Sequence, residues 1–228
     1  MAAIALTRST IGKKVIMAVT GMIWIGYVAV HMYGNLKVFF GPEYFNHYAE
    51  GLRVLGEPLL GRLHLLTVAR IVLVGSIVAH VWAAVSLTRQ AQTARPQRYA
   101  VTKRVSADYA ALTMRWGGAT IFFFILYHLA HLTWGVSLLN TNYVLGEAYQ
   151  NLVNGFQNPI NVTLYLLALV ALAFHLYHGT WSMFQTLGLL DRNTTPPVRA
   201  LAWILAIVIP VGFAVVPISV MLGIIALQ

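Results

Sequence analysis

The sequence contains no cysteine among its 228 residues. Disulfides, iron–sulfur clusters and thiolate ligation of a metal within this chain are therefore excluded. Charge is also scarce, since charged residues make up 9% of the chain and only six residues are acidic. Soluble domains carry about 25% charged residues, whereas 59% of this chain is hydrophobic. The composition therefore indicates an integral membrane protein.

Apolar segments recur along the chain, each about as long as the 20 residues that a helix needs to cross a bilayer. We expect an all-α fold, in which a single domain (1–228) forms an integral membrane bundle of five transmembrane helices. The aromatic and charged residues of the loop at 37–61 predict an interfacial helix, and Pro159 marks a helix start. No cleavable signal peptide is expected, because the first apolar run is too long. The expected spans are about 15–36, 62–87, 111–139, 160–189 and 198–227.

The net charge of +9 does not indicate nucleic-acid binding, because the basic residues cluster at the ends of apolar segments. Eleven Lys and Arg residues flank one side of the expected bundle and four flank the other. The positive-inside rule then predicts a cytoplasmic amino terminus and an outer carboxyl terminus, in a bacterial plasma membrane. The eleven are Arg8, Lys13, Lys14, Arg89, Arg95, Arg98, Lys103, Arg104, Arg115, Arg192 and Arg199, and the four are Lys37, Arg53, Arg62 and Arg70.

Histidine is the chemically distinctive residue, with eight copies. His47 and His64 lie at the expected membrane interface, where water is available. The others lie inside apolar spans, where an ionisable side chain is costly and usually functional. Simple packing is the competing interpretation. These deep residues are His31, His80, His128, His131, His175 and His178.

Haem fits these histidines better than zinc does. Zinc needs three or four ligands that converge on one point. Here His31 lies about 25 Å from the basic end of its span, while His80 lies about 13 Å from Arg89, at 1.5 Å per residue. Two haems b inside the bundle, each held by two imidazoles from different helices, would use four helices at two depths.

The histidines of the first and third spans are expected in the outer half of the membrane, and those of the second and fourth spans in the inner half. We therefore expect the first span to pair with the third, and the second with the fourth. The third span offers His128 or His131, and the fourth offers His175 or His178. Each of these alternatives differs by three residues, which places both members on one helix face. Spacing therefore leaves both choices open.

Two stretches of sequence extend this interpretation. STIGKKVIMAVTG precedes VHMYGNLKVFFGPEYFNHYAE near the first span, and FHLYHGTWSMF occurs in the fourth. On these motifs the chain resembles the cytochrome b membrane anchor of succinate:quinone oxidoreductases, of the type with one polypeptide and two haems. The family pattern has glycine four residues after a ligand, as Gly179 follows His175, and an aromatic residue before another, as Tyr127 precedes His128. The resemblance implies as ligands His31 and His128 (distal haem), and His80 and His175 (proximal haem).

The resemblance also implies partners. Anchors of this family hold a flavoprotein (FAD) subunit and an iron–sulfur subunit at the cytoplasmic face, and pass electrons from succinate to a membrane quinone, for which menaquinone is favoured. Arg115 would pair with a haem propionate or act as a positive-inside anchor. His131 and His178 would contact a propionate or a quinone, or only pack. Glu50 is the nearest candidate for accepting quinol protons.

Two other functions share some of these features. The cytochrome b subunit of a hydrogenase or formate dehydrogenase also carries histidines inside helices, and only the family motifs argue against it. A transporter or proton channel with a histidine relay would more often show intramembrane carboxylates and internal symmetry. No expected span has a central Asp or Glu. Some relatives carry a carboxylate beside the fourth-span ligand, where this chain has Leu172 and Ala173.

Overall fold

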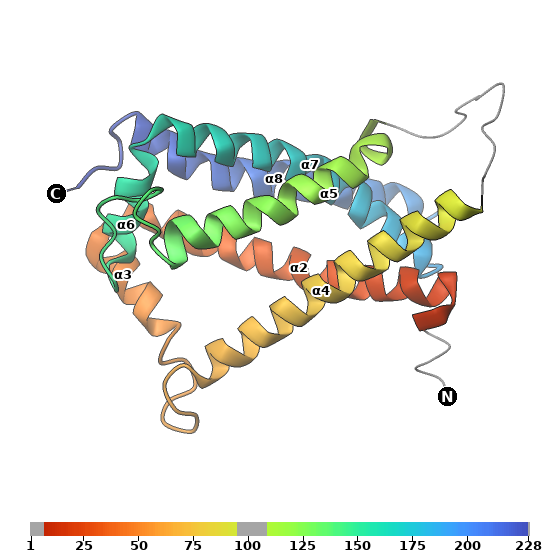
Figure 1. Cartoon of the computed structure of the whole chain (residues 1–228), viewed down its shortest axis with the longest axis horizontal. Helices are drawn as coiled ribbons and strands as arrows, with labels where there is room; N and C mark the ends of the chain where they lie inside the picture. Colours follow the sequence, from red (N-terminus) through yellow and green to blue (C-terminus); the bar gives the residue numbers. More distant parts are fainter. Residues whose placement is uncertain (1–6, 95–108, 228) are drawn as a thin grey trace.

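The computed structural model describes residues 7–94 and 109–227, and this part of the chain is all-α (Figure 1). Five of its segments are long and apolar enough to cross a membrane, which confirms the predicted architecture. These segments are α2 (Thr10–Leu36) with η1 (Lys37–Phe40), α4 (His64–Thr93), α5 (Tyr109–His128) with η2 (Leu129–Thr133), α7 (Pro159–Thr186) and α8 (Thr195–Met221). The predicted basic loop residues Arg95, Arg98, Lys103 and Arg104 lie outside the described residues.

Local capping explains where two of the spans begin. The Ser9 hydroxyl accepts a hydrogen bond from the Gly12 amide at 3.0 Å, so α2 already begins within the predicted basic lead. The Asn158 side chain accepts from the Ile160 amide at 2.9 Å, and Pro159 occupies the first helical position as predicted. Such side chains satisfy amide groups that have no partner within the helix.

The third and fifth spans end earlier than predicted. The α-helix of the third span ends at His128, continues as the π-helix η2, and does not reach residue 139. Gly135 then takes a left-handed φ of 61°, a conformation that ends helices and favours glycine. In the fifth span, α8 ends at Met221 rather than 227, because Gly223 turns the chain with a φ of 71°.

Short helices cover the end of the bundle at which α2 ends and α7 begins. The predicted interfacial helix is present as α3 (Pro42–Gly51), and α6 (Ala148–Phe156) is a helix that was not predicted. The Asn46 side chain joins the two, since it accepts from the Tyr149 amide and donates to the Glu147 carboxylate, both at 2.9 Å. These contacts close one end of the bundle.

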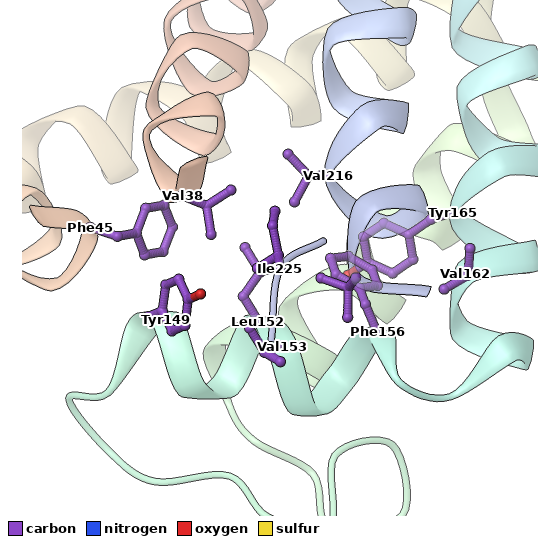
Figure 2. Packing of buried hydrophobic residues seen from close by; sticks show 11 residues of the cluster. Val38, Phe45, Tyr149, Leu152, Val153, Phe156, Val162, Tyr165, Val216 and Ile225 are labelled. Carbon is purple, nitrogen blue, oxygen red and sulfur yellow. The ribbon is translucent and has the colours of Figure 1, made fainter. Parts of the chain in front are cut away.

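The long helices pack around α2 and α7. α2 contacts α4, α7 and α8, and α7 also contacts α5 and α8. α4 packs chiefly against α2 and diverges from the other helices toward its own amino-terminal end (Figure 1). The largest buried cluster lies at the closed end, where side chains from η1, α3, α6, α7 and α8 meet (Figure 2). Most apolar side chains of α4 and α5 are exposed, which fits helices that face lipid.

Candidate haem-binding site

His31 of α2 and His128 of α5 face each other across the bundle. Their ring centroids are 5.8 Å apart, with the ring planes at 82°. The Tyr27 ring stacks on His31 at 5.3 Å and 10°, and Phe213 of α8 contacts His31 from another side at 5.6 Å. This α2–α5 pair therefore lies among aromatic side chains.

A second pair joins His80 of α4 to His175 of α7, with ring centroids 6.2 Å apart and planes at 55°. A glycine lies beside each ring. A Cβ at Gly21 would stand 3.6 Å from His80 Cε1, and a Cβ at Gly118 would stand 3.6 Å from His175 Cε1. Larger side chains at these two positions would occupy the space around this α4–α7 pair.

Both pairs fit two imidazoles on one metal ion. A metal–imidazole bond is about 2 Å long, so two imidazoles on opposite sides of an ion have ring centres about 6 Å apart. His175 Nδ1 is buried without a hydrogen-bond partner, which is uncommon for a polar atom. Within residues 7–94 and 109–227, no group of three or more His, Cys, Asp or Glu side chains could hold a metal. The arrangement thus suits two-ligand sites such as bis-imidazole haem.

The two pairs lie at different depths, and two helices give the same separation. Thr20 of α2 contacts His80 and precedes His31 by 11 residues, which is about 16 Å along a helix. Tyr165 of α7 contacts His128 and precedes His175 by 10 residues, or about 15 Å.

One ring nitrogen of His80 is already engaged by the protein. Its Nδ1 lies 3.1 Å from the Thr20 hydroxyl, which donates its proton to the Ile16 carbonyl at 2.7 Å. A hydroxyl has one proton, so Thr20 accepts from His80 Nδ1–H. The Nε2 of His80 then keeps its lone pair for a metal.

His128 and His131, which spacing could not distinguish, have different surroundings. Each Nδ1 lies 3.0 Å from the Tyr165 hydroxyl. His131 is fully buried, and its Nε2 lies 3.1 Å from the Asn161 amide nitrogen. Both ring nitrogens of His131 thus have protein partners, and neither is free for a propionate or a quinone oxygen.

Tyr165 and Asn161 are site residues that were not predicted from the sequence. They lie four residues apart on α7, hence on one helix face, and both are buried. An asparagine in a membrane span by itself indicates a polar site, because its buried amide needs hydrogen-bond partners. Thr20 was missed as well, and a lone threonine in an apolar helix carries no comparable signal.

Arg115 and His178 lie one turn from residues of the α4–α7 site. Arg115 is exposed on α5, three residues before Gly118. His178 is half-buried on α7, three residues after His175. These positions are compatible with contacts to a group held at that site.

Glu50 lies at the end of α3, at the closed end of the bundle. Its carboxylate forms ion pairs with Arg53 at 2.9 Å and Arg62 at 2.5 Å. Hydrogen bonds from these guanidinium groups hold the pKa of Glu50 below its ordinary value. A carboxylate with a lowered pKa is a weak proton acceptor.

A cleft of about 930 Å³ runs along α4 beside the start of α2 and part of α5. Its walls are largely apolar and include Trp82 and Phe122, while Lys13 and Arg89 supply positive charge. The Lys13 ammonium lies 5.9 Å from the Trp82 ring centre. The cleft suits an amphipathic ligand with a polar head and an apolar body.

Comparison with known proteins gives a family match. The family of succinate dehydrogenase/fumarate reductase transmembrane subunits matches residues 97–214, which are 118 of the 228 residues. The match contains His128 and His175, one member of each imidazole pair, whereas His31 and His80 lie before it. Neither the curated proteins nor the solved structures give a match. Since the match covers more than half of the chain, this protein belongs to the family of succinate dehydrogenase/fumarate reductase transmembrane subunits.

Proposed function

We propose that this chain is a two-haem electron conduit, in which His31 and His128 hold a distal haem b, and His80 and His175 a proximal one. The observation that carries this proposal is the two imidazole pairs, each joining two helices with ring centroids about 6 Å apart. Four separate spans supply one histidine each, and family membership supports haem as the group they hold.

A haem with two imidazole ligands transfers single electrons and has no open iron position for oxygen chemistry. The chain itself orients the imidazoles and separates the two pairs by about 15 Å along its helices. Thr20 keeps His80 in one tautomer, and Gly21 and Gly118 leave space beside the rings of the α4–α7 pair.

The proposed partners are the flavoprotein (FAD) and iron–sulfur subunits of a succinate:quinone oxidoreductase, docked at the cytoplasmic face. The excess of Lys and Arg on the side of the bundle that carries the amino terminus supports that orientation and offers a basic docking surface. Electrons would pass from the iron–sulfur subunit to the proximal site, then to the distal site and a membrane quinone, with menaquinone favoured. Arg115 and His178 are the proposed contacts of a propionate at the proximal site.

Haem content of the purified complex tests the proposal. We expect a dithionite-reduced minus oxidised spectrum of b type, with two haems per chain by pyridine haemochrome assay. Replacing any one of His31, His80, His128 or His175 by Gln should remove one haem and leave the other.

Two histidine variants serve as matched controls. His64 is exposed at the start of α4, and His178 is the neighbour that spacing could not separate from His175. His64→Gln and His178→Gln should both keep two haems. A colourless wild-type complex would contradict the haem proposal, and two retained haems in both His80→Gln and His175→Gln would contradict the ligand assignment.

Family membership argues against the two rival functions. The matched family is that of succinate dehydrogenase/fumarate reductase subunits, not of hydrogenases or formate dehydrogenases. A histidine-relay transporter would more often show carboxylates within the spans. None of the six acidic residues of the sequence falls inside the spans observed in the described part of the chain.

A further inference from the structure

A chain of hydrogen bonds leads from the backbone of α6 to His128 of the α2–α5 pair. It starts at the Gly155 carbonyl, passes through His131 and the Tyr165 hydroxyl, and ends at His128 Nδ1. His131 lies in η2, the π-helix that follows His128, and π-helical turns are frequent at functional sites. Tyr165 projects from α7 into the buried cluster beside Phe156 (Figure 2).

The direction of this chain follows from the asparagine beside it. The Tyr127 hydroxyl donates to Asn161 Oδ1 at 2.6 Å, and two carbonyls at the other end of the amide identify that end as the nitrogen. The Asn161 amide nitrogen donates to the carbonyls of Leu139 at 3.0 Å and Gly155 at 2.7 Å. An amide nitrogen carries two hydrogens, so Asn161 has none left to donate to His131 Nε2.

His131 Nε2 therefore carries the proton of the neutral imidazole, and it lies against the backbone of Gly155, whose carbonyl can accept this proton. The contact is close, since a Cβ at Gly155 would overlap this nitrogen. In the neutral ring the other nitrogen, Nδ1, is an acceptor, and the Tyr165 hydroxyl at 3.0 Å donates to it. With its single proton committed to His131, Tyr165 can only accept from His128, whose Nδ1 must then carry a hydrogen.

We infer that Tyr165 is a positioning residue for the distal haem: its hydroxyl oxygen accepts from His128 Nδ1–H and so leaves His128 Nε2 as the free ligand nitrogen. This role rests on the proposed function. The same hydrogen bonds distinguish His128 from His131 as the ligand, which sequence spacing could not do. The Nε2 of His131 is protonated and lies against Gly155, whereas the Nε2 of His128 keeps its lone pair.

The hydrogen bond has an electronic consequence. A ligand imidazole that donates its other N–H to an acceptor becomes a stronger electron donor to the metal and is fixed in orientation. A stronger donor favours the oxidised metal, so the Tyr165 hydroxyl lowers the reduction potential of the distal haem. Thr20 accepts from His80 in the same way at the other site, but no hydroxyl relay to a second histidine accompanies it among the described residues.

The test is a redox titration of the complex with Tyr165→Phe, followed optically and by electron paramagnetic resonance. We expect the midpoint potential of one haem to rise, or that haem alone to be lost, while the other haem keeps its potential and occupancy. Tyr127→Phe is the matched control, since it removes a tyrosine hydroxyl from the same cluster without touching His128. It should leave both haem potentials unchanged.

The role of Tyr165 is refuted if Tyr165→Phe keeps two haems with wild-type potentials and spectra, or if Tyr127→Phe shifts the same haem by as much. If Tyr165→Phe yields a complex with no haem, the variant His131→Leu tests the role of Tyr165 instead. That variant removes the acceptor of the Tyr165 proton, which weakens the hydroxyl as an acceptor for His128. A smaller rise in the same haem's potential supports the role, and no shift overturns it. Absence of haem from the wild-type complex would instead refute the proposed function.

Discussion

Replacing Asn161 by leucine should destabilise the closed end of the bundle. The side chain is buried and makes three hydrogen bonds, to the carbonyls of Leu139 and Gly155 and from the Tyr127 hydroxyl. Leucine keeps a similar volume and removes all three. At about 0.6 kcal/mol for a hydrogen bond within a membrane protein and about 1 kcal/mol for one in a soluble protein, the expected loss is about 2–3 kcal/mol.

The free energy of unfolding is measured by sodium dodecyl sulfate titration of the purified complex in a mild detergent. The control is Asn154→Leu on α6, because the Asn154 amide makes a single exposed hydrogen bond, to the Asn142 carbonyl at 3.2 Å. Exposed substitutions of this kind change stability by about 0.5 kcal/mol or less. Equal unfolding curves for the two variants would show that the three hydrogen bonds of Asn161 do not stabilise the fold.

Three further changes have defined outcomes. Thr20→Val removes the acceptor of His80 Nδ1–H, so the potential of the proximal haem should rise in a redox titration while the distal one stays constant. Gly118→Leu should fill the space beside His175 and lower haem content from two to one by pyridine haemochrome assay, whereas Gly118→Ala should keep both, since its Cβ would be in ordinary contact. The pKa of Glu50 is lowered by its two arginines, so its ion pairs persist above that value and are lost as pH falls through it. Within the acidic range in which pepsin is active, pepsin should therefore cut the loop after α3 at a higher pH in Glu50→Gln than in the wild-type chain.

The five spans could be predicted because each is one long apolar run, and bilayer thickness alone sets its length. Helix ends were harder to predict. Residues 134–139 continue the apolar pattern of the third span, but Gly135 turns the chain, and the Tyr143 hydroxyl then donates to the Thr133 carbonyl at 3.0 Å. The helix α6 was missed because its buried residues face a cluster built from five other parts of the chain, and local periodicity does not reveal such a partner.

Spacing placed histidines at two depths but could not separate His128 from His131. Residues three apart share a helix face, so the difference between them comes from neighbouring helices. In the structure, Asn161 and Gly155 lie beside the second ring nitrogen of His131, while His128 instead faces His31. These neighbours come from α6, α7 and α2, and no pattern within the third span encodes them.

The ten-residue interval between the two sites restricts how this chain can change in length. On α5, Gly118 borders the ring of His175 and His128 follows ten residues later. Every inserted or deleted residue between them would rotate one end of the helix by about 100° relative to the other, turning His128 away from His31. Seven inserted residues would turn His128 back toward His31, but would move the two histidine pairs about 10 Å further apart. Single-residue insertions or deletions in this interval should therefore be far less tolerated than substitutions.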